Sequence, residues 1–114
     1  MTKIRIENDK TEAVKKAVEA AIPQALTGAA LIVEAAAKNL SPVDTGNLRG
    51  SITHEINPDH AKVGTNVEYA PYVEYGTSKM SAQPYLRPGL DSNKAAINQH
   101  MKGIYSAAIK AVTG

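Results

Sequence analysis

A long alanine-rich segment limits the folds that are open to this chain. From Glu12 to Leu40 the sequence is rich in Ala, Lys, Glu and Val. A helix of this length would span about 45 Å, which is long for so small a domain. Pro23 and Gly28 interrupt the pattern, and because proline removes a backbone donor we expect a kink or two helices at Pro23. The apolar residues that follow helical spacing are Val14, Val18, Ala21, Ala25, Ala29, Ile32, Ala36 and Leu40.

Shorter elements are expected on both sides of this segment. Residues 3–7 alternate polar and apolar side chains, as in a half-buried strand, and residues 8–11 supply candidates for the helix N-cap. Residues 41–47 are dense in turn formers, so the helix should end there. Two runs that alternate or are rich in β-branched residues, 51–56 and 61–67, predict an antiparallel hairpin.

The last third of the chain predicts an irregular stretch and then a second helix. Residues 69–85 hold four of the five tyrosines and two prolines, and a helix is expected from about 88 to 112. The expected fold is a single α+β domain over residues 1–114. It has a long N-terminal helix, kinked near Pro23, and a C-terminal helix, both packed on a small antiparallel β-sheet.

The composition constrains the core of this domain. The chain has 114 residues, of which 43% are hydrophobic, and it has no Phe, Trp or Cys. The core must therefore consist of Ala, Val, Ile, Leu, Met and some of the five Tyr residues. Small side chains fill space only when backbones come close together, so we expect tight helix packing. Such helices bury little apolar area each, which favours burial that continues across a subunit interface.

Charge and cysteine content exclude several classes of protein. The net charge of +2 is too small to indicate a nucleic-acid-binding protein, and the basic residues are spread out. Without Cys there is no disulfide framework and no thiolate metal site, which fits a reducing compartment. No stretch is expected to be apolar enough to cross a membrane, and residues 1–5 lack the apolar core of a signal peptide. We expect a protein that acts inside a cell or leaves it without a signal.

The motifs that indicate catalysis are weak. Asp44-Thr45-Gly46 is the triplet of aspartic proteases, and one Asp per subunit of a dimer would suffice. Here, however, it follows an alanine-rich helix and Ser-Pro, a context that favours a simple turn. The protease stays open as a minor alternative. The three histidines have no metal-ligand spacing and are interpreted as surface residues. We expect no catalytic residues, no metal and no cofactor.

Four of the five tyrosines form a cluster within 17 residues: Tyr69, Tyr72, Tyr75 and Tyr85. With Lys79 and Arg87 they would resemble a base-stacking surface, but Glu68 and Glu74 oppose this charge. Tyrosine also buries area while it keeps a polar tip, which suits protein interfaces. We therefore favour core and interface roles, and a small nucleic-acid-binding module remains the alternative. Binding that weakens steeply with salt would identify that alternative.

Two arginines stand beside turns, each after a leucine. They are Arg49, which follows Leu48, and Arg87. A guanidinium group at such a place binds carboxylates or backbone carbonyls in a fork, and Asp44 and Glu74 are possible partners. A solvated arginine is an equally good interpretation for either position.

Three segments, in order along the chain, resemble a known family. They are SPVDTGNLRGSI at 41–52, VGTNVEYAPYVEYGT at 63–77 and QPYLRPGLD at 83–91. Together they are similar to the head–tail joining, neck and tail-completion proteins of tailed phages that are related to minor tail protein Z. The resemblance extends over about residues 10 to 112.

This resemblance implies a non-enzymatic virion component of a phage or prophage that connects the capsid portal to the tail. Its partners would be other connector, portal or tail-tube proteins and further copies of itself, with no small-molecule substrate and no membrane. It would be located in the virion, and in the host cytoplasm during assembly. The residues expected to shape the fold or the docking surface are Asp44, Gly46, Leu48, Arg49, Tyr69, Tyr72, Glu74, Tyr75, Gly76, Tyr85 and Arg87.

Overall fold

The computed structural model describes residues 10–42 and 47–114. The strand expected at 3–7 and the residues Asp44 and Gly46 lie outside the described residues. The elements are mostly helical, with one small sheet, as expected. In chain order they are α1 (Thr11–Leu40), α2 (Asn47–Ser51), β1 (Thr53–Ile56), β2 (Ala61–Gly64), α3 (Ala70–Tyr75), α4 (Leu86–Asp91) and α5 (Lys94–Thr113).

Helix α1 forms where the apolar spacing predicts it. It runs through Pro23, so the alternative of two separate helices is wrong. Pro23 has no N–H, which leaves the carbonyl of Glu19 without its usual donor, but the remaining bonds hold the helix. The helix ends at the expected turn, where the N–H of Ser41 donates to the carbonyl of Ala37 at 2.9 Å. The Ser41 hydroxyl also donates to the carbonyl of Lys38 at 2.9 Å.

Helix α1 is also long and apolar enough, by length and composition, to span a membrane. Its most apolar 18-residue window has a mean hydropathy of 1.4. The expectation that no stretch reaches this level is therefore wrong. Between Lys16 and Lys38 the helix carries only two charged residues, Glu19 and Glu34, and its many alanines raise the mean. The central helix of a soluble protein meets the same criterion, and α1 does contact elements on two sides.

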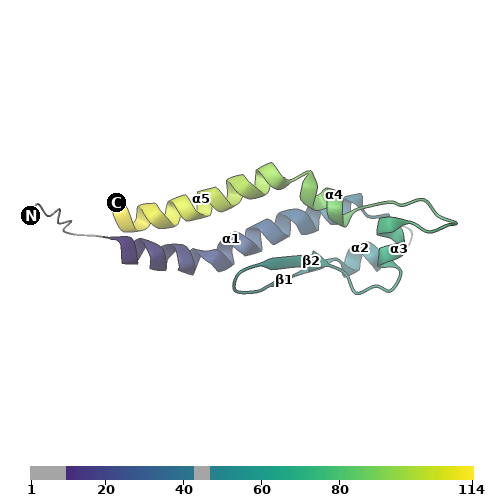
Figure 1. Cartoon of the computed structure of the whole chain (residues 1–114), viewed down its shortest axis with the longest axis horizontal. Helices are drawn as coiled ribbons and strands as arrows, with labels where there is room; N and C mark the ends of the chain where they lie inside the picture. The colour runs from purple at the N-terminus through teal and green to yellow at the C-terminus, as the bar shows by residue number, and fades with distance from the viewer. Residues whose placement is uncertain (1–9, 43–46) are drawn as a thin grey trace, which may run out of the picture.

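Helix α1 is the centre of the arrangement. Figure 1 shows α5 running back along one side of α1 and the β1–β2 hairpin lying along the other side. Of the two long helices, only α1 covers the hairpin, whereas α5 packs on α1. The free ends of the two helices meet, since Lys10 Nζ donates to the carbonyl of Val112 at 3.2 Å. The three short helices gather at the other end of α1.

A cluster of buried residues lies at that end, and Ala25, Ala30 and Val33 are buried further back along α1. The cluster consists of Ala37, Leu48, Ile52, Ala70 and Tyr85. Helix α5 has no buried residue, although it is 20 residues long. The small side chains allow the close approach that the composition predicts. A Cβ on Gly89 of α4 would lie 3.1 Å from the backbone nitrogen of Ala37, so α4 packs almost directly on the backbone of α1.

Several boundaries differ from the expected ones. Residues 47–51 form helix α2, so the strand begins at Thr53 and not at Ser51. The returning strand ends at Gly64 rather than at residue 67. The expected C-terminal helix is divided into α4 and α5, because the helix is interrupted at Ser92 and Asn93. There the Asn93 side-chain amide donates to the carbonyl of Gly89 at 2.8 Å, a local bond that competes with a continuous helix.

The hairpin pairs Thr53 with Gly64 and Ile56 with Ala61. His54 and Glu55 point to opposite faces, as expected of neighbours on a strand. His54 is half-buried against α1, with its Nδ1 3.3 Å from Glu34 Oε1. The expectation of a surface histidine is therefore wrong for His54.

His100 is not a plain surface residue either. A Cβ added to Gly28 would overlap the imidazole ring of His100, so this glycine makes room for the ring between α1 and α5. The ring nitrogen Nε2 is buried there without a hydrogen-bond partner in the described part of the chain. Gly28 interrupts the helical pattern of α1 because it accepts this side chain.

We expect Gly28→Ala to lower the free energy of unfolding by about 1–3 kcal/mol, the usual cost of overfilling a packed site. The double variant Gly28→Ala/His100→Ala should lose the clash, so the two changes should be non-additive in urea unfolding. Gly103→Ala on α5 is the matched control. A Cβ there meets nothing within 4 Å, and alanine should stabilise the helix by about 0.5–1 kcal/mol. Equal effects of alanine at positions 28 and 103 would contradict this packing.

Candidate protein interface at the tyrosine-rich end

The tyrosine-rich segment is more ordered than expected, because residues 70–75 form helix α3. Pro71 lies in its first turn, where the missing N–H costs nothing. The helix ends at Gly76, whose N–H donates to the carbonyl of Tyr72 at 2.8 Å. Gly76 has φ +78°, a backbone conformation that favours glycine. Helix α3 therefore presents its side chains in a fixed arrangement.

The tyrosine cluster divides into two groups. Tyr69, Tyr72 and Tyr75 are exposed, with 40%, 58% and 81% of their surface accessible, whereas Tyr85 is completely buried. Met80, in the loop that follows α3, is 40% exposed. Large apolar side chains rarely gather at the surface of one short segment without a partner. The exposed group is the interface candidate, and Tyr85 belongs to the core.

Glu74 is the buried charged residue of this region. Its Oε1 accepts hydrogen bonds from the backbone N–H groups of Leu86 at 2.8 Å and Tyr85 at 3.3 Å. These two N–H groups lie at the start of α4, where helical N–H groups lack partners of their own. Glu74 thus joins α3 to α4. Glu74, considered above as a possible partner of an arginine, forms no ion pair with Arg49 or Arg87 in the described part of the chain.

Tyr85 fills the core beneath this contact, and its hydroxyl is buried without a hydrogen-bond partner among residues 10–42 and 47–114. Burial raises the pKa of Tyr85 above its ordinary value of 10.0. The nearby Glu74 carboxylate and Tyr69 raise this pKa further.

We expect Tyr85→Phe to be neutral at pH 7 or to raise the free energy of unfolding by up to about 1 kcal/mol, since the buried hydroxyl has lost its water. The gain should increase above pH 10. The unfolded chain releases the Tyr85 proton at lower pH than the folded chain, so the stability of the wild type falls as pH rises through the tyrosine range. Urea unfolding of both proteins at pH 7 and at about pH 10.5 measures the difference. A constant difference between the two proteins would contradict the raised pKa.

The other residues expected at the site are dispersed. Leu48 is buried in the core. Arg49 Nη2 donates to the carbonyl of Ser41 at 3.3 Å, so Arg49 ties α2 to the end of α1. Asp44, its possible partner, lies outside the described residues. Arg87 is exposed and forms no ion pair in the part of the chain that the structure describes.

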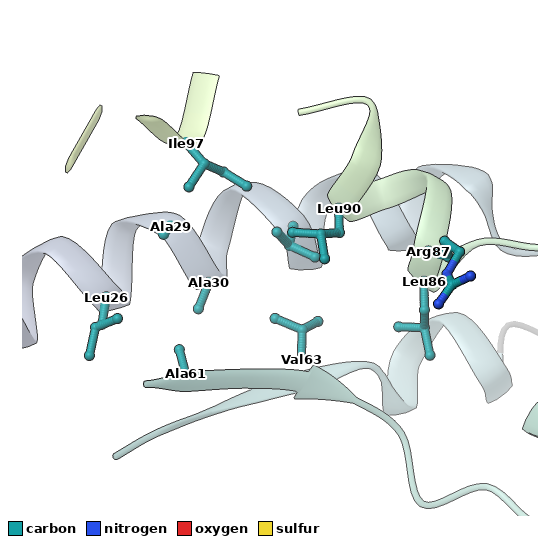
Figure 2. Close-up of a pocket in the computed structure, with 10 residues that line it drawn as sticks. Leu26, Ala29, Ala30, Ala61, Val63, Leu86, Arg87, Leu90 and Ile97 are labelled. Atoms are coloured by element: carbon teal, nitrogen blue, oxygen red, sulfur yellow. The ribbon is translucent and has the colours of Figure 1, made fainter. Parts of the chain in front are cut away.

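Two open pockets flank Arg87. The first, of about 380 Å³, lies between α1, β2 and the α4–α5 region and is almost entirely apolar (Figure 2). Leu26, Val63 and Leu90 point into it from three different elements. The second, of about 370 Å³, lies beside α3. The residues that line the second pocket are Thr65, Asn66, Val67, Glu68, Ala70, Pro71, Glu74, Tyr75, Tyr85, Leu86 and Arg87.

Neither pocket has the composition of a catalytic site. Within the described ranges no three His, Asp or Glu residues come together to hold a metal ion. The mostly helical fold also disagrees with an all-β aspartic protease. The pockets themselves and the contact of Glu74 with α4 were not predicted. The sequence around Glu74 gives no local signal that its hydrogen-bond partners lie 11 and 12 residues further along the chain.

The fold and this surface define a small, mostly helical protein whose exposed tyrosines suit contact with other proteins. A family profile described as "Bacteriophage HK97-gp10, putative tail-component" matches residues 6–76, more than half of the chain. The chain belongs to this family and is a structural phage protein. The resemblance to head–tail joining proteins of tailed phages is thereby confirmed. No curated protein and no solved structure matches the chain.

Proposed function

We propose that the chain is a virion component of a tailed phage or prophage that joins the capsid portal to the tail, as a neck or tail-completion protein. It acts through protein–protein contacts and has no enzymatic activity. Membership of a phage tail-component family supports this assignment. The partners are portal, connector or tail-tube proteins and further copies of the chain. It is located in the virion, and in the host cytoplasm during assembly.

The observation that carries the proposal is the exposed group of Tyr69, Tyr72, Tyr75 and Met80. Aromatic residues and Met are enriched where proteins meet, and each of them buries a large apolar area. Helix α3 and its hydrogen-bonded ends hold three of these side chains in place before any partner arrives. A preorganised apolar surface loses less entropy when it binds.

Deletion of the gene from its phage or prophage tests this function. We expect filled capsids and separate tails, seen by electron microscopy, and a loss of infectious particles that the wild-type gene restores. The variant Tyr72→Ser/Tyr75→Ser should fold but fail to restore joining. Ile109→Ser, which replaces an exposed apolar residue on α5 outside this group, is the control. Normal virions in the deletion strain would refute the proposal.

A further inference from the structure

A hydrogen-bonded turn projects from the tyrosine-rich end of the molecule. Residues 77–80 (the 77–80 turn) close through two backbone bonds between Thr77 and Met80, of 2.8 and 3.3 Å. The N–H of Lys79 donates to the Thr77 hydroxyl at 3.2 Å. Behind the turn, the N–H of Gln83 donates to the carbonyl of Val73 at 2.8 Å and ties the loop to α3. In Figure 1 the loop between α3 and α4 extends beyond the rest of the fold.

The turn carries one cation and one large apolar side chain at its tip. Met80 is 40% exposed, and Lys79 is exposed. Lys79 forms no ion pair with any residue in 10–42 or 47–114. An ordered turn that presents Lys and Met to solvent has the form of a ligand that is shaped before it binds.

The pocket beside α3 (the Glu68 pocket) offers the complementary chemistry. Its walls include the apolar side chains of Val67, Ala70 and Pro71, and its carboxylates belong to Glu68 and Glu74. Glu68 is exposed and, like Lys79, has no ion-pair partner in the described chain. Arg87 lines this pocket as well as the apolar pocket on the other side, so the lining carries two carboxylates and one guanidinium group.

None of residues 77–80 lines the Glu68 pocket, so the turn does not fill the pocket of its own copy in this conformation. We propose that the 77–80 turn of one copy docks into the Glu68 pocket of a second copy, with Lys79 against Glu68 and Met80 against the apolar wall. This inference rests on the proposed function and names the surface through which copies join. The proposed contact is heterologous, with one turn in one pocket for each pair of copies, so that every pair still offers a free turn and a free pocket and the contact repeats from copy to copy, as in a ring.

Disulfide trapping tests the contact directly, because the chain has no cysteine. Purified Lys79→Cys and Glu68→Cys proteins are mixed under mild oxidation. We expect a covalent dimer in the mixture and little in either protein alone, and a ladder of oligomers from the double variant Lys79→Cys/Glu68→Cys. Lys102→Cys, an exposed lysine on α5, mixed with Glu68→Cys is the control and should give no dimer.

Charge reversal gives a second readout, by light scattering across a concentration series. Lys79→Glu and Glu68→Lys should each weaken self-association roughly tenfold or more, and the double reversal should restore it. Both side chains are exposed, so neither change threatens folding. A wild-type chain that stays monomeric, a missing mixed disulfide, or a double reversal that fails to restore association would overturn the docking. None of these outcomes bears on the proposed joining function, which the deletion experiment tests independently.

Discussion

Replacing Glu74 with alanine is expected to lower the free energy of unfolding by about 3 kcal/mol, since a hydrogen bond to a charged group contributes about 1.5–3 kcal/mol. The Glu74 carboxylate accepts hydrogen bonds from the N–H groups of Tyr85 and Leu86. Alanine removes this acceptor, so both N–H groups at the start of α4 lose their hydrogen-bond partner. The site is buried, so water replaces the lost acceptor poorly. Urea unfolding followed by circular dichroism measures the loss.

Two further variants make this prediction specific. Glu74→Gln keeps an acceptor oxygen of the same reach, and we expect a loss of only about 1 kcal/mol, the value of a neutral hydrogen bond. Glu68→Ala removes an exposed glutamate from the same segment and should change stability by less than about 0.5 kcal/mol. If Glu74→Ala and Glu68→Ala had the same effect, the link between α3 and α4 would be unimportant for stability.

Gly76→Ala should cost about 2–4 kcal/mol, for two reasons that act together. The backbone has φ +78° and ψ 176°, a region essentially confined to glycine, where strain costs about 1–3 kcal/mol. A Cβ would also lie 2.7 Å from the backbone nitrogen of Ala82, and a backbone atom cannot move aside as a flexible side chain can. Thermal and urea unfolding both report this loss.

The control is Gly50→Ala in α2, where a Cβ meets nothing within 4 Å and φ is not positive. Alanine there should be neutral or stabilising. Because Gly76 leads into the 77–80 turn, Gly76→Ala should also reduce the mixed disulfide between Lys79→Cys and Glu68→Cys. A fully stable Gly76→Ala protein would show that the turn tolerates another backbone conformation.

The elements that the sequence predicts well are those decided by neighbours in the chain. The apolar spacing of 12–40 and the turn formers after Leu40 are local signals, and α1 begins and ends close to the expected places. The hairpin was found for the same reason. Helix α2 was missed because Asn47-Leu-Arg-Gly-Ser has the composition of a turn, and its Leu48 becomes helical only through burial against the core.

The features that were not predicted depend on residues far apart in the chain. Charge alone paired Glu74 with an arginine, yet two backbone N–H groups at the start of a later helix are its partners. His100 had the features of a surface residue because its contact, Gly28, is 72 residues away. The sequence predicts core and interface roles for the tyrosine cluster as a whole. Only the fold shows which tyrosine has which role, since Tyr85 is buried and Tyr75 is exposed.

The one-sided core has a consequence for how the molecule opens. The first residue of α1 that is buried is Ala25, and α5 has no buried residue among Lys94–Thr113. Amide groups near Lys10 and Val112 are therefore protected from hydrogen exchange by little more than the pairing of the two helices, whereas amides around Ala37 and Ile52 exchange only when the whole core unfolds. We therefore expect the free end of the helix pair to unfold and refold independently of the tyrosine-rich end. A neighbouring subunit that covers this free end slows its exchange while leaving the core rates unchanged.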